Sequence, residues 1–183
     1  MAPQDQRRTS PLTLHLLAGI QSGVLGGAGM IAVMGLGAIV ERHAFWAIPN
    51  VLGSLFYGRD ALRTSFGAPA AAGLALHFFA AGAIGALFGI LTGEFRKTLR
   101  VLLMGTVTGL LWYYASLALL WRKLGVLGDL YASPQSMLLA HAVYGIVLGC
   151  YPSGLRSIAK RFLGEPEPPP ATSGQQAPTD RIE

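Results

Sequence analysis

Residues 12–40 read LTLHLLAGIQSGVLGGAGMIAVMGLGAIV, a stretch that contains no Asp, Glu, Lys or Arg. Three further stretches share this property, at 70–93, 101–121 and 130–155. A helix needs about 20 apolar residues to cross a hydrocarbon layer of about 30 Å. Because lipid offers the backbone no hydrogen-bond partners, such stretches are expected to be helical. The sequence therefore predicts an all-α, four-transmembrane-helix bundle with spans at about 12–40, 70–93, 98–121 and 135–155.

Composition and charge agree with a membrane location. Of the 183 residues, 52% are hydrophobic and 13% are charged, whereas a soluble domain carries about 25% charged residues. The net charge is +5, but the basic residues cluster at the ends of the spans, where they contact lipid headgroups. This placement favours a lipid bilayer over nucleic acid as the partner. With both termini in the cytoplasm, nine basic residues face inward and five outward, which predicts that orientation.

The regions outside the spans divide the chain into three parts. Residues 1–11 form a polar lead, 12–163 the transmembrane domain, and 164–183 a Pro-rich tail that is expected to be disordered. The connection at 41–69 is long, and Ile48, Leu52, Leu55 and Phe56 recur in it at helical spacing. We expect a short helix that lies in the membrane interface of this first outer connection.

Three of the spans repeat one pattern, a histidine followed at steps of four by small residues. The sets are His15-Gly19-Gly23, His77-Ala81-Gly85 and His141-Gly145-Gly149, and 98–121 keeps the frame with Val101, Gly105 and Gly109. The rows continue to Gly27 and Gly89. A step of four keeps these positions on one helix face, where small residues let helices approach closely. The pattern predicts glycine-lined helix packing and is consistent with duplication of a helical hairpin.

His77 and His141 are the candidate site residues. Both lie about two turns into spans that run in the same direction, so they should share a depth. They could simply stabilise packing through hydrogen bonds, or act as axial ligands of a haem b held between the helices. They could also bind zinc or copper together with His43, or hold a quinone or a lipid headgroup.

The sequence lacks the usual marks of a catalyst or an ion-coupled transporter. No span contains a buried Asp, Glu, Lys or Arg of the kind that ion pathways use. Phosphate-binding loops and the HExxH and GxSxG motifs are absent, and Cys150 is the single cysteine. The sequence therefore predicts a protein that is not an enzyme and has no metal site.

From His77 onward the layout resembles the YagU-like group of small bacterial inner-membrane proteins. The residues that carry the resemblance are His77, the turn at 94–97, Gly105 and Gly109, then His141 and the basic segment 156–161. The resemblance covers about half of the chain and has no diagnostic motif. It implies a multi-pass protein of the bacterial cytoplasmic membrane with four helices, and it implies no chemistry.

Three functions follow as hypotheses. The first is a non-catalytic accessory or assembly subunit that packs against other membrane subunits or against itself, with no cofactor. The second is an electron-transfer protein that binds haem b through His77 and His141. The third is a transporter or channel for a small neutral or lipid-like molecule, for which the spans offer a few polar residues such as Gln21 and Ser22.

Overall fold

The computed structural model describes residues 10–63, 65–93, 98–124 and 133–163. These residues are 91% helical and include no strand, which confirms the all-α prediction. The predicted lead falls mostly, and the predicted tail entirely, outside the described residues, as does the turn at 94–97. The described residues therefore consist almost entirely of the helices.

Four long helices make up most of the structure: α1 (Pro11–Val40), α3 (Ala68–Thr92), α4 (Thr98–Ser116) and α7 (Pro134–Gly149). A π-helix, η2 (Leu117–Trp121), and a short α5 (Arg122–Leu124) extend α4. Three segments, Pro11–Val40, Ala68–Thr92 and Thr98–Leu124, are long and apolar enough to cross a membrane. A fourth is added if α7 and α8 (Tyr151–Leu163) form one bent span.

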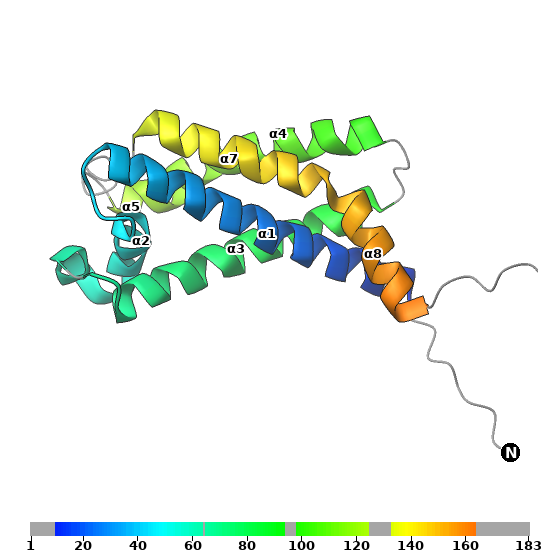
Figure 1. The fold of residues 1–183 in the computed structure, drawn as a ribbon, viewed down its shortest axis with the longest axis horizontal. Helices are drawn as coiled ribbons and strands as arrows, with labels where there is room; N and C mark the ends of the chain where they lie inside the picture. Colours follow the sequence, from blue (N-terminus) through cyan, green and yellow to red (C-terminus); the bar gives the residue numbers. More distant parts are fainter. Residues whose placement is uncertain (1–9, 64, 94–97, 125–132, 164–183) are drawn as a thin grey trace, which may run out of the picture.

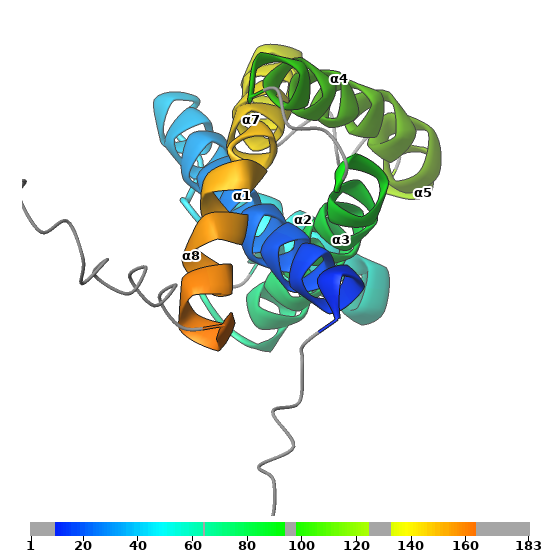
Figure 2. The same cartoon turned by 90° about the vertical axis from the view of Figure 1, so that its right-hand side faces the viewer.

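The long helices pack side by side in the order α3, α1, α7, α4 (Figures 1 and 2). Among the described residues of the four long helices, the close pairs are α1 with α3, α1 with α7, and α4 with α7. The pair α3 and α4, at the two ends of this row, is not among them. Figure 2 shows the row curving so that α3 and α4 face each other. The four-helix arrangement is thus open along one side, and a closed bundle is not confirmed.

Glycines form the contacts of α1 with α3 and of α4 with α7. A Cβ atom on Gly85 of α3 would fall on the carbonyl oxygen of Gly19 and lie 2.7 Å from Cα of Gly23, both on α1. A Cβ atom on Gly105 of α4 would lie 2.5 Å from the carbonyl oxygen of Gly145 on α7. Gly89, Gly109 and Gly149 meet the neighbouring helix about as closely, and a Cβ atom on Gly27 would lie 2.9 Å from Cβ of Ala81. At these positions only glycine, which has no side chain, lets the backbones of the two helices approach this closely.

The short helix predicted in the first connection exists as α2 (Ala47–Tyr57), followed by the 3₁₀ helix η1 (Gly58–Arg63). Its residues 47–53 are all buried, and α2 packs mainly against α3. Phe56, near the end of α2, is 63% exposed, and the position of this helix in the membrane interface stays a prediction. A Cβ atom on Gly73 would overlap the carbonyl oxygen of Pro49, so α2 and α3 touch through their backbones.

The span predicted at 135–155 is interrupted at Cys150, where α7 ends and α8 begins at an angle of 43°. The interruption has a local cause. Pro152 has no N–H group to donate to the carbonyl of Leu148, four residues earlier, and its ring crowds that carbonyl. Beyond the bend, α8 packs on the first half of α1 and exposes Arg156, Lys160 and Arg161.

Candidate functional site

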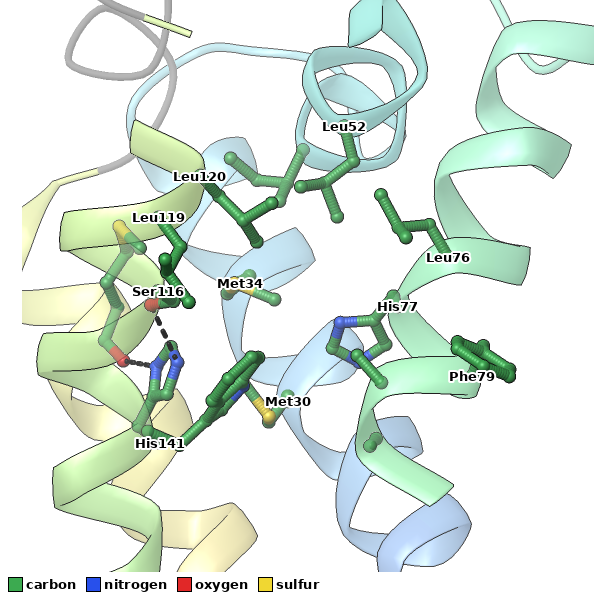
Figure 3. Close-up of a pocket in the computed structure, with 15 residues that line it drawn as sticks. Met30, Met34, Leu52, Leu76, His77, Phe79, Ser116, Leu119, Leu120 and His141 are labelled. Atoms are coloured by element: carbon green, nitrogen blue, oxygen red, sulfur yellow. Dashed lines mark hydrogen bonds between the residues drawn. The ribbon is translucent and has the colours of Figure 1, made fainter. Parts of the chain in front are cut away.

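A cavity of about 260 Å³ lies between α3 and α4, and Figure 3 shows its walls. Met30 and Met34 of α1 form its back, and Ile48 and Leu52 of α2 close one end. The remaining lining residues come from α3, α4, η2 and α7: Leu76, His77, Phe79, Ala80, Ala81, Trp112, Ser116, Leu119, Leu120, Met137 and His141. Nearly all of this wall is apolar. Its main polar groups are two histidine side chains that come from different helices, His77 from α3 and His141 from α7.

The cavity reaches the surface on the open side of the helix row. Phe79 of α3 and Leu119 of η2 both line it, yet their side chains are 75% and 62% exposed. Phe79 lies near the middle of α3, which is one of the candidate membrane spans. A molecule that enters past Phe79 and Leu119 would therefore come from the hydrocarbon layer rather than from water.

His77 points from α3 into this cavity (Figure 3). Its Nε2 lies 2.9 Å from the carbonyl oxygen of Gly27 on α1. A carbonyl oxygen can only accept, so Nε2 carries the proton and donates it. A charged imidazole in a membrane interior is costly, which favours the neutral ring. Nδ1 of His77 is then an unprotonated nitrogen with a free lone pair.

His141 projects from α7 and is 3% exposed. Its Nδ1 donates to the carbonyl oxygen of Met137 at 2.7 Å, so the neutral ring presents its lone pair on Nε2. Nε2 lies 3.5 Å from Oγ of Ser116, beyond the usual hydrogen-bond range. The Ser116 hydroxyl instead donates to the carbonyl oxygen of Tyr113 at 2.8 Å. Two acceptors, Nε2 and the Ser116 oxygen, therefore face each other with no proton between them.

The wall beside His141 is formed by the π-helix η2, which begins directly after Ser116 and contributes Leu119 and Leu120 to the cavity. Single π-helical turns inside α-helices occur often at functional sites. The sequence LALLW contains no proline or glycine, so sequence reasoning had no signal with which to find it. The turn changes which side chains of the α4 segment face α3.

The other histidines lie outside the cavity lining. His15 is near the start of α1, where its Nδ1 contacts the hydroxyl of Tyr151, and it belongs to the packing of α8. His43 is not part of the lining, so the structure does not bring it to His77 and His141. Among the described residues no group of three or more His, Cys, Asp or Glu side chains is placed to hold a metal ion.

Tyr144 is a fully buried side chain that connects three helices. It leaves α7, passes Gly26 of α1, and donates a hydrogen bond of 2.8 Å to the carbonyl oxygen of Ala81 on α3. A Cβ atom on Gly26 would lie 2.8 Å from Cδ2 of this ring, so the missing side chain of Gly26 leaves the room that the ring of Tyr144 needs. Tyr144 thus holds the backbone of a residue that lines the cavity, because Ala81 belongs to the lining.

Comparison of the chain with protein-family models, with curated proteins and with solved structures finds no match.

Proposed function

We propose that this protein is a non-catalytic, multi-pass protein of the bacterial cytoplasmic membrane that binds a neutral, lipid-like molecule in the cavity between α3 and α4. The single observation that carries the proposal is an apolar cavity with two inward-facing histidines and a mouth formed by Phe79, midway along one candidate span, and Leu119, near the end of another. Its ligand arrives from the bilayer and is held without being transformed.

The size of the cavity favours a compact ligand, or one compact part of a larger one. Drug-sized and cofactor sites usually have volumes of about 300–1,000 Å³, and this cavity has about 260 Å³. The apolar walls suit a ring or a chain segment, and the two imidazoles supply polar contacts that favour one orientation. The hydrocarbon around the mouth excludes ionic molecules, because a charge in that layer is costly.

The proposal is tested by blocking the cavity. Ala80 lines it, so Ala80→Trp should fill it, whereas Ala83→Trp adds the same side chain to the exposed face of the same helix. Protein purified in native lipid particles is extracted, and its bound molecules are quantified by mass spectrometry against the bulk lipid. We expect one neutral species to be enriched with the wild type and Ala83→Trp and lost with Ala80→Trp. Equal lipid profiles for all three proteins would refute the proposal.

An accessory or assembly role is a second proposal and is compatible with the first. It is supported by a ridge of exposed apolar side chains along α4, formed by Leu99, Leu103, Val107, Leu111 and Tyr114. Such a ridge can contact either lipid or a helix of another subunit. Native mass spectrometry from gently solubilised membranes separates the two, because a lone monomer would remove the support for a partner.

The haem alternative has weaker geometric support. The cavity is smaller than usual cofactor sites, so α3 and α4 would have to move apart to admit a macrocycle. Nε2 of His77 is already committed to Gly27, which leaves only Nδ1 for an iron ion. An absorption spectrum of the reduced protein decides the question, because a bis-histidine haem b gives a Soret band and a sharp α-band.

A further inference from the structure

The hydrogen bonds around the cavity determine what kind of polar group a ligand must bring. Each imidazole uses its one N–H group on a backbone carbonyl, His77 on Gly27 at 2.9 Å and His141 on Met137 at 2.7 Å. The nitrogen that remains on each ring can only accept. Among the described residues, Nδ1 of His77 has no hydrogen-bond partner, and Nε2 of His141 has only the distant oxygen of Ser116.

Of the two acceptor nitrogens, Nε2 of His141 is the one for which the lack of a hydrogen-bond donor is more unfavourable. The residue is 3% exposed, so water or lipid headgroups do not reach it easily. Ser116 cannot satisfy it without giving up the 2.8 Å bond to Tyr113, because a hydroxyl has one proton. A buried acceptor without a donor is unfavourable, and a ligand that supplies a donor removes that penalty. A ligand with only a carbonyl or ether oxygen would add another acceptor instead.

We propose that the ligand carries a hydroxyl group that donates a hydrogen bond to Nε2 of His141, which places it among apolar alcohols and phenols rather than ketones, quinones or ethers. This inference rests on the proposed function, that the cavity binds a neutral molecule from the bilayer. The hydroxyl lies beside Ser116, and the apolar remainder of the ligand packs on Met30 and Met34 and extends toward Phe79.

The test compares two probes that differ in the donor alone, 8-bromooctan-1-ol and its methyl ether. The bromine quenches tryptophan fluorescence, and Trp112 lines the cavity. The protein carries Trp46→Phe and Trp121→Phe, so that Trp112 is the one remaining tryptophan, and it is held in phosphatidylcholine nanodiscs. We expect the alcohol to bind on the order of tenfold more tightly, which corresponds to about 1.4 kcal/mol. Simple partitioning into lipid gives the opposite order, because the ether is the more apolar probe.

Two variants assign the preference to one nitrogen. His141→Phe should bind both probes equally, with ether affinity unchanged, and the retained ether binding shows that the variant is folded. His77→Phe should keep the preference for the alcohol. Equal binding of the two probes by the wild type, or a preference that survives in His141→Phe, would overturn the inference and leave the proposed function standing. Absence of saturable quenching by either probe would overturn the proposed function itself.

Discussion

Replacing Gly85 by alanine should separate α1 from α3, and the structure gives the size of the effect. The new Cβ atom would lie 2.7 Å from Cα of Gly23 and would overlap the carbonyl oxygen of Gly19. Ordinary van der Waals contact begins at 3.4 Å. The helices must therefore move apart by roughly 0.7 Å or more, because both obstacles are backbone atoms that cannot rotate away.

Gly82→Ala is the matched control on the same helix. Gly82 is also buried, but its Cβ atom would meet only Cγ2 of Val24, at 3.6 Å. Both substitutions gain the same helix propensity, up to about 1 kcal/mol. Overpacking typically costs about 1–3 kcal/mol. The difference between the two variants should then equal the steric penalty, so Gly85→Ala should be less stable than Gly82→Ala by about 1–3 kcal/mol.

Stability is measured by titrating detergent-solubilised protein with sodium dodecyl sulfate and following the loss of helical circular dichroism. A second measurement reports the separation directly, with spin labels on Leu25→Cys of α1 and Leu87→Cys of α3, both 57% exposed in the native chain, and with Cys150→Ala as background. The label-to-label distance should increase in Gly85→Ala alone. If Gly85→Ala and Gly82→Ala are equally stable, glycine contact does not hold α1 against α3.

Three further results are expected. Tyr144→Phe removes the 2.8 Å hydrogen bond to Ala81 and should lower the free energy of unfolding by about 0.6–1.7 kcal/mol in the same titration, while Tyr114→Phe, at a residue that is 66% exposed, should change nothing. Pro152→Ala restores an N–H group for the carbonyl of Leu148 and should reduce the 43° bend, so that spin labels at positions 139 and 160 move apart; an unchanged distance would place the cause of the bend elsewhere. For the proposed orientation, a membrane-impermeant maleimide should label Tyr57→Cys in intact cells and Arg161→Cys only after lysis, and the reverse pattern would contradict cytoplasmic termini.

The long helices could be predicted because the signal for them is local. A run without charges predicts a span from its own residues, and the predicted 12–40 and 70–93 agree closely with α1 and α3. The break at Cys150 was missed even though Pro152 signalled it, since a charge-free stretch also runs through the bend. The burial of α2 had no local signal. It depends on Gly53 and Gly73 meeting the backbone of a partner helix, which is a property of the pair.

The candidate site was predictable only in part for the same reason. The repeated histidine pattern selected His77 and His141, and the structure brings both to one cavity. The pattern could not show which ring nitrogen is free, because Gly27 belongs to another helix than His77. His15 shares the pattern but was not a candidate site residue, and it packs against Tyr151 near the bend between α7 and α8. Ser116 and η2 were not selected, because their importance arises only from their position beside His141.

The open side of the helix row follows from how the small residues are distributed. α1 uses Gly19 and Gly23 against α3 and, on another face, gives room at Gly26 to Tyr144 of α7. α7 in turn meets α4 through Gly145 and Gly149. The two central helices, α1 and α7, thus each pack against two long helices through two different faces. The glycine-rich faces of α3 and α4 each pack against one long helix, α1 and α7 respectively. α3 and α4 instead line the cavity with larger side chains such as His77 and Trp112, and these prevent the backbone approach that glycines permit elsewhere. The glycine faces that hold α1 against α3 and α4 against α7 therefore leave α3 and α4 apart, and the cavity occupies the space between them.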